Sequence, residues 1–212
     1  GVHSRQVFKW LETHKDFDID VQILRWGSTS WMINPDMEDG LVGRVMERSG
    51  EPNPDLKYDL TFQVQLPDEW DSSLGKVNIG VSAVVETDTC NPAWLQKMNE
   101  MSCVIVPSLH IKKTIENTGK VSTPIHVVPE WYFEQIDRNE KKDINLNLST
   151  DFNFFMNGTI TSSGSESDRK NTFNTIKWFC EAFENDKDVG LIIKSTITGR
   201  GTRIDRHMTK KL

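Results

Sequence analysis

The chain opens with apolar residues at helical spacing. Val7, Trp10 and Leu11 recur at i, i+3 and i+4, as on one face of an amphipathic helix. This pattern predicts a helix over residues 3–14, and the hydroxyl of Ser4 can cap its amino end.

Two alternating runs follow, separated by a stretch that is rich in glycine and proline. Residues 19–26 alternate between polar and apolar side chains and favour a strand. Residues 60–66 alternate more regularly and predict a second strand, which Pro67 ends. Most of the intervening stretch, 27–57, is expected to be loop, with a short helix over 41–48.

Strands and helices are predicted to alternate in the middle of the chain. The strands are short apolar runs, as in sheets covered on both faces. Asn91 and Ser108 stand where N-caps belong, and Gly119 is expected to end a helix in the left-handed conformation. The short connections predict crossover units in a parallel sheet. The expected elements are strand 78–85, helix 92–101, strand 103–107, helix 109–118 and strand 125–129.

A charged stretch separates two predicted domains. Residues 137–143 are nearly free of apolar side chains, so 134–150 is interpreted as an interdomain connection. We expect an N-terminal domain over 1–133 and the start of a second domain over 151–212. The second is expected to contain strand 152–156, helix 169–183 with a buried stripe, and strand 189–194. The stripe consists of Phe173, Ile176, Phe179, Cys180 and Phe183.

Both domains are expected to be incomplete. Two strands and one helix cannot bury both faces of an α/β sheet. The first domain opens on a helix, where a doubly wound domain should open on a strand.

Composition narrows the class of protein and its partners. The 212 residues carry 25 lysines and arginines against 31 aspartates and glutamates, a net charge of −6. This balance gives no electrostatic reason to expect nucleic acid as a partner. No apolar run approaches the roughly 20 residues of a membrane span. With three widely spaced cysteines and no signal-peptide pattern, a cytoplasmic α/β protein is expected.

Loops at the carboxyl ends of the predicted strands can carry chemistry, because ligands of open parallel sheets bind there. One such loop holds Glu86 and Asp88, whose carboxylates can accept hydrogen bonds from sugar hydroxyls. The same pair also suits a solvated turn before the positive end of the next helix. Another loop places Glu130 beside Trp131, which suits either a carbohydrate or packing between domains.

A third loop, 157–168, runs from a strand into a helix that is expected to start with Arg169 and Lys170. Free backbone N–H groups and the helix dipole attract an anion, and the two cations stand at the rim. Glu166 and Asp168 partly oppose an anion. A flexible serine-rich loop explains the same composition equally well.

Motifs for other chemistries are missing from the sequence. Neither GxxxxGK[ST] nor GxGxxG is present, which weakens the hypothesis of a nicotinamide-dependent oxidoreductase. No GxSxG nucleophile motif occurs, and no group of residues has metal-ligand spacing. No bound metal or cofactor is expected.

Several segments, in this order, resemble the GT-B glycosyltransferases of the broad group 1, family-4-like set. They are 86–88, 92–95, 98–101, 104–108, 112–113, 116–119 and 124–129. The stretch 104–129 resembles the family's "VPS…SGV…PI.VVP" signature. Residues 1–7 look like the end of its glycine-rich first loop, and 152–158 with 169–171 look like the opening of its donor domain.

This resemblance implies two Rossmann-like domains with parallel sheets, both truncated here. It implies transfer of a sugar from a nucleotide-sugar to a carbohydrate or glycoconjugate acceptor in the interdomain cleft, without a bound metal. A helix amino end and basic side chains would meet the charge of the leaving diphosphate. Carried over to this chain, the donor-phosphate positions are Arg169, Lys170, Gly158 and Thr159. The acceptor side is expected to comprise His3, Ser4, Glu86, Asp88, Ser108, Glu130 and Trp131.

One departure from the family keeps a second hypothesis open. Nothing in 195–212 matches the family's E-x7-E donor segment, so much of the nucleotide pocket would be missing and no catalytic residue is assigned. The alternative is a non-catalytic binding module that retains a partial GT-B fold. Its open sheet edges would then be covered in an oligomer, since unpaired edges invite pairing.

Overall fold

The computed structural model consists of two compact units, Gly1–Glu140 and Lys141–Leu212, which are described one at a time. The boundary at residue 140 falls inside the charged stretch 134–150. The described residues are 1–24, 34–51, 55–132, 146–158, 166, 168 and 170–195.

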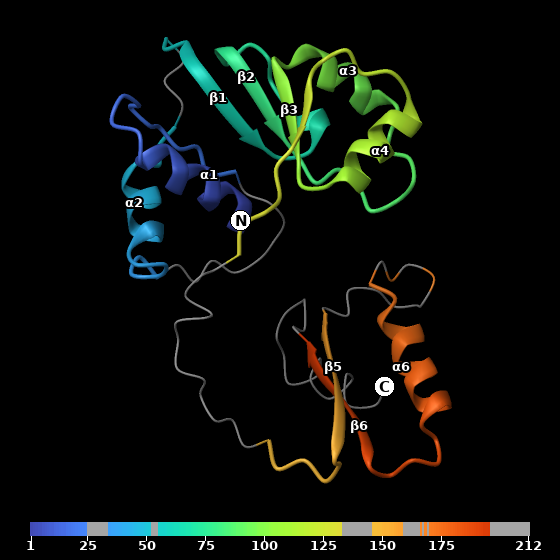
Figure 1. Ribbon diagram of the computed structural model, residues 1–212. Coiled ribbons are helices and arrows are strands. Elements are labelled where there is room, and N and C mark those ends of the chain that lie inside the picture. The colour runs from blue at the N-terminus through green and yellow to red at the C-terminus, as the bar shows by residue number, and fades with distance from the viewer. Residues whose placement is uncertain are drawn as a thin grey trace. The chain divides into compact units, whose positions relative to one another are not determined.

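A four-stranded parallel sheet organises the first unit (Figure 1). Its strands lie side by side in sequence order, and every neighbouring pair is parallel. This arrangement confirms the expected α/β class with parallel sheets. The strands are β1 (Tyr58–Val64), β2 (Gly75–Val81), β3 (Cys103–Val106) and β4 (Ile125–Val127).

Helices form the crossovers between these strands. Helix α3 (Ala93–Glu100) joins β2 to β3, and α4 (Leu109–Thr118) joins β3 to β4. A short 3-10 helix, η1 (Pro67–Glu69), lies between β1 and β2. Because parallel crossovers are right-handed, crossovers that advance in one direction fall on one face of the sheet. Two earlier helices, α1 (Val2–Glu12) and α2 (Leu41–Glu47), lie beside β1 (Figure 1).

The core of the first unit lies between β3 and the crossover helices. Val104 and Val106 of β3 are fully buried, as are Met98 of α3 and Ile115 of α4. Burying such a side chain contributes about 1.5–3 kcal/mol relative to leaving it in water. Around them pack Trp70, Val84, Cys90, Trp94, Met101 and Ile111.

Of the two N-caps predicted for the crossover helices, Ser108 is confirmed, whereas the N-cap of α3 is Pro92 and Asn91 stands one position before it. The Asn91 carboxamide oxygen accepts a hydrogen bond from the Ala93 backbone N–H at 3.1 Å. The Ser108 hydroxyl accepts one from the Ile111 N–H at 3.3 Å. Each satisfies a donor that the first helical turn leaves without an intrahelical partner.

A tryptophan packed on a glycine joins η1 to the sheet. The Trp70 indole N–H donates to the Gln63 carbonyl at 3.0 Å, and the ring is buried. A Cβ atom at Gly80 of β2 would lie 2.7 Å from that ring. Gly80 is therefore required by close approach, a common reason for glycine inside a strand.

Two expectations for the amino-terminal region are wrong. The run 19–26 forms no strand among its described residues: only Val21 pairs, in an isolated parallel bridge with Ser49. Alternation shows only that a segment could have one buried and one exposed face. A strand also needs several paired residues on a neighbouring strand, and here only Ser49 pairs. Ser4 is no cap, because α1 already begins at Val2 with Gly1 as its N-cap.

The carboxyl ends of β2 and α4 also differ from expectation. Strand β2 spans 75–81 and not 78–85, since Val84 adopts a left-handed conformation with φ of 52°. The Ser82 hydroxyl accepts from the Val84 N–H at 3.1 Å and stabilises this turn. Gly119 is extended, with φ of 162°, and not left-handed. A Cβ there would lie 2.8 Å from Leu95, so packing explains the glycine.

The second unit contains two parallel strands and one helix. Strands β5 (Phe152–Gly158) and β6 (Val189–Ser195) pair along their whole length, and α6 (Thr172–Ala182) connects them. Phe154 of β5 contacts Phe179 and Phe183, with ring centroids 5.9 and 5.4 Å apart. The predicted elements are confirmed, although the helix begins at Thr172 and not at 169.

Part of the stripe predicted for this helix is wrong. Cys180, which was expected in the stripe, is exposed. Phe173, Ile176, Phe179 and Phe183 are only half-buried in the described unit.

In the part of the chain that the structure describes, no helix is long and apolar enough to cross a membrane.

The left-handed Val84 gives a stability prediction. A β-branched residue there pays a conformational cost that glycine does not. We expect Val84→Gly to be at least as stable as Val84→Ala in urea unfolding, although glycine in a strand usually costs about 0.5–1 kcal/mol more than alanine. Val81, buried in β2, is the control, where the usual order should hold. The same order at both positions would contradict the prediction.

Candidate functional site

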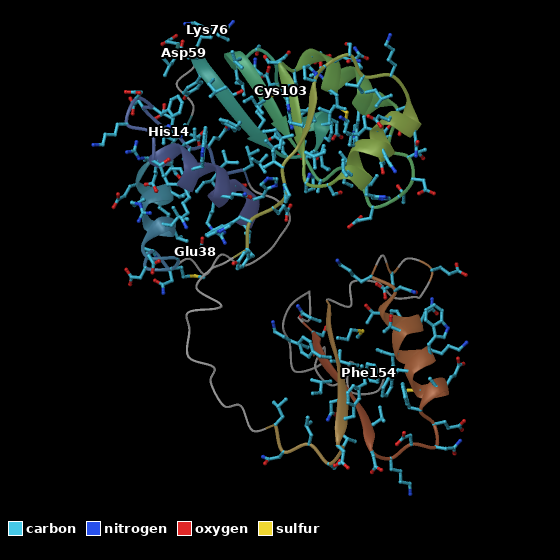
Figure 2. The ribbon with its side chains drawn as sticks, viewed as in Figure 1. His14, Glu38, Asp59, Lys76, Cys103 and Phe154 are labelled. Carbon is cyan, nitrogen blue, oxygen red and sulfur yellow. The ribbon has the colours of Figure 1, made fainter. Side chains whose placement is uncertain are left out.

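The carboxyl edge of the four-stranded sheet is the place where a parallel α/β unit binds ligands. Four segments leave the sheet there: 65–66 after β1, 82–92 after β2, 107–108 after β3 and 128–132 after β4. The opposite edge carries the exposed ion pair Lys76–Asp59, whose Nζ and Oδ1 lie 2.6 Å apart (Figure 2).

Helix α1 is held in place by two ion pairs. Arg44 of α2 donates through its Nε and Nη2 to both carboxylate oxygens of Glu12, at 2.8 and 3.2 Å. Arg5 Nε lies 2.7 Å from Glu38, a carboxylate that is 4% exposed and precedes α2. Figure 2 shows Glu38 beside these helices. The two pairs fix α1 relative to α2.

The segment after β4 lies against α1. His3 Nδ1 is 3.4 Å from Glu130 Oε1, with side-chain exposures of 12% and 50%. The Gln6 amide contacts the backbone of Pro129 and Trp131. The Lys9 ammonium lies 4.3 Å from the Trp131 ring centroid, a cation–π distance. Three residues proposed from the sequence, His3, Glu130 and Trp131, therefore come together.

The loop with Glu86 and Asp88 is anchored on α4. The Thr114 hydroxyl donates to the Thr87 carbonyl at 2.8 Å, and the Asn117 amide donates to the Asp88 carbonyl at 3.2 Å. Both acidic side chains are exposed on this anchored loop. They are held by α4, whereas His3, Glu130 and Trp131 meet on α1.

The other two acceptor-side residues have simpler surroundings. The Ser108 hydroxyl caps α4, so its oxygen is used structurally. Ser4 lies next to His3 on α1 and is exposed.

The amino end of α6 holds a carboxylate from the chain itself. Asp168 is buried and accepts backbone N–H groups from Lys170 at 3.1 Å, from Thr172 and from Phe173 at 3.3 Å. Asn171, the N-cap, is left-handed with φ of 54°. Burial raises the pKa of the Asp168 carboxyl, but these hydrogen bonds outweigh it and hold the pKa below the ordinary value.

This arrangement changes the interpretation of the donor-phosphate positions. The N–H groups expected to face a diphosphate are already bonded to Asp168. Lys170 is exposed beside them, and Gly158 ends β5. Arg169 and Thr159 lie outside the described residues. From the sequence, Asp168 is expected only to oppose an anion; an aspartate three positions before Asn171 was the available signal for a cap.

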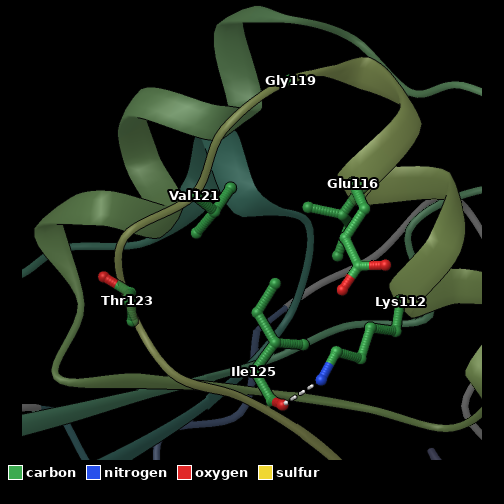
Figure 3. A pocket seen from close by; sticks show the side chains of 7 residues that line it. Lys112, Glu116, Gly119, Val121, Thr123 and Ile125 are labelled. Carbon is green, nitrogen blue, oxygen red and sulfur yellow. Dashed lines mark hydrogen bonds between the residues drawn. The ribbon is translucent and has the colours of Figure 1, made fainter.

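A hollow of about 170 Å³ lies between α4 and the segment that enters β4 (Figure 3). Lys112 crosses it to the Ile125 carbonyl at 3.5 Å, with Glu116 beside it. Ile125 begins β4, so the hollow lies at the amino end of that strand. It is smaller than ordinary ligand pockets and is not at the carboxyl edge.

No group of three or more His, Cys, Asp or Glu side chains that could hold a metal ion occurs among the residues with described positions. Comparison of the chain with protein-family profiles, curated proteins and solved structures finds no match.

The Asp168 cap gives a pH prediction. Because its folded pKa is depressed, its stabilisation is fully present above the ordinary aspartate pKa of about 3.9 and is lost as the pH falls through the folded value. We expect Asp168→Asn to lower the thermal midpoint of α6 at pH 7, and the difference from wild type to shrink as the pH falls below the ordinary aspartate pKa of about 3.9.

The α6 amide signals in NMR, followed during heating at each pH, measure this midpoint. Asp151→Asn, which removes one exposed charge from the same unit, is the control for net charge. A difference at Asp168 that stays constant from pH 7 to pH 2 would show that its charge contributes nothing to the cap.

Proposed function

We propose that this chain is a GT-B-type glycosyltransferase, or a portion of one, that transfers a sugar from a nucleotide-sugar to a carbohydrate or glycoconjugate acceptor. The resemblance of segments 86–129 to that family supports the proposal, as do two units built on parallel strands. The observation that carries it is the meeting of His3, Glu130 and Trp131 at the carboxyl edge of the sheet.

These three side chains suit an acceptor sugar. The half-exposed Trp131 ring offers an apolar face to the C–H side of a pyranose. The Glu130 carboxylate, half exposed, can accept hydrogen bonds from sugar hydroxyls, and His3 orients it from 3.4 Å. In this proposal Ser4, Glu86 and Asp88 add polar contacts around the acceptor, while Ser108 shapes the loop by capping α4.

The donor side of the proposal depends on basic side chains in the second unit. Since Asp168 uses the N–H groups of α6, the charge of the leaving diphosphate would be met mainly by Lys170 and Arg169, with the turn at Gly158 and Thr159 next to it. Such preorganised charges lower the barrier because they stabilise the charge that develops in the transition state.

The acceptor site can be tested by saccharide binding. Saturation-transfer NMR with a panel of mono- and disaccharides should detect binding to the full chain. Trp131→Ala should weaken the affinity about tenfold, since a stacked ring contributes on the order of 1 kcal/mol or more. Trp178→Ala is the matched control, because Trp178 is an exposed tryptophan of the second unit. Equal effects of the two variants would contradict the proposed site.

The donor site can be tested by calorimetry with a nucleoside diphosphate. Lys170→Ala should weaken binding about tenfold, because a charged hydrogen bond to phosphate contributes roughly 1.5–3 kcal/mol. Lys177→Ala removes a lysine that pairs with Glu181 on α6 at 3.7 Å and should leave binding unchanged. If calorimetry detects no heat of binding with the wild-type chain, the donor proposal is wrong.

One observation favours a second candidate, the non-catalytic binding module. In the second unit Phe152, Phe155 and Trp178 are large apolar side chains with more than half of their surface exposed. A partner or a second copy could cover them together with the edges of the β5–β6 sheet. Failure of both binding tests, together with a stable oligomer in light scattering, would favour this candidate.

A further inference from the structure

The strip of α1 that faces the chain after β4 consists of His3, Gln6 and Lys9. These residues are one short turn apart and contact consecutive positions of one extended segment, Pro129 to Trp131. His3 and Lys9 contact side chains of that segment, whereas Gln6 contacts its backbone.

Gln6 uses both ends of its amide. Its Nε2 donates to the Pro129 carbonyl at 3.4 Å, and its Oε1 accepts from the Trp131 N–H at 2.9 Å. The two partners fix the orientation of the amide, because the opposite orientation would set donor against donor and acceptor against acceptor. The residue between them, Glu130, is thereby held with its side chain next to His3.

We infer that Gln6 is the positioning residue of the acceptor site, whose backbone clamp on Pro129 and Trp131 holds Glu130 and Trp131 in place. The expected effect of Gln6 on saccharide binding rests on the proposed function. The two hydrogen bonds of the clamp do not depend on that proposal. Gln6 was not among the site residues expected from the sequence, because its two partners are more than 120 positions away along the chain.

Gln6 is not what keeps α1 folded or attached. Phe8 is the buried side chain of the helix, at 5% exposure, and the pairs Glu12–Arg44 and Arg5–Glu38 join it to α2. Alanine is a better helix former than glutamine, so Gln6→Ala should not weaken α1 itself. Loss of the clamp can therefore be separated from loss of the helix.

Amide hydrogen exchange of Trp131 in the full chain, measured by NMR, tests the clamp. Gln6→Ala should speed this exchange about five- to tenfold, the effect of losing one net hydrogen bond. Gln6→Glu keeps an acceptor for the Trp131 N–H but sets a carboxylate oxygen against the Pro129 carbonyl, so it should speed the exchange by less than Gln6→Ala does. Gln96→Ala, at an exposed position on α3, should leave it unchanged.

Three outcomes separate the clamp from the proposed function. If Trp131 exchange in Gln6→Ala equals that of wild type, or if Gln6→Glu behaves like Gln6→Ala, the clamp is overturned. If the exchange pattern is as expected, and saccharide affinity falls in Gln6→Ala but not in the control Gln96→Ala, the positioning role is supported. If the exchange pattern is as expected but the wild-type chain binds no saccharide, the clamp stands and the proposed function fails.

Discussion

Apolar contact between β3 and the helices α3 and α4 is the constraint on which the first unit depends. Val104, Met98 and Ile115 have no exposed surface, so the strand and both helices cannot shift independently. The loops that leave the carboxyl edge therefore start from a rigid frame. Thr114 and Asn117 of α4 extend that frame by holding the backbone of the loop that carries Glu86 and Asp88.

The candidate acceptor site is assembled from the two ends of the first unit. Helix α1 comes from its beginning and the segment after β4 from its end, and Gln6, His3 and Lys9 join them. Ion pairs with α2 and with the residues just before it hold α1 in this position. The Arg44–Glu12 pair is partly exposed, and such pairs contribute modestly to stability. The Arg5–Glu38 pair includes a carboxylate that is only 4% exposed, and a buried pair does little for stability once the loss of hydration is counted. The main effect of both pairs is therefore orientation: they decide which face of α1 meets Glu130 and Trp131.

In the second unit, a carboxylate from the chain itself accepts the free backbone N–H groups at the amino end of a helix. A helix that starts near glycines, serines and two cations looks from its composition like an anion site, yet Asp168 already accepts the first two N–H groups of α6 and that of Lys170 before it. A dipole neutralised in this way offers little to a second anion. In the proposed donor site the charge of the diphosphate is therefore met mainly by basic side chains, of which Lys170 lies among the described residues.

Local patterns in the sequence determined the succession of strands and helices from β1 to β4, the parallel class and the cap Ser108, because each depends on neighbours a few positions away. They failed at 19–26, where alternation was present without a long partner strand, and at Val84, where a turn ends the apolar run. Tertiary structure alone decided that Gln6 contacts Trp131, whereas the bonds of Asp168 to the end of α6 are local and were open to prediction from the sequence. Contacts such as that of Gln6 with Trp131 depend on how separate elements pack, and the residues that make them leave no periodic signal along the chain.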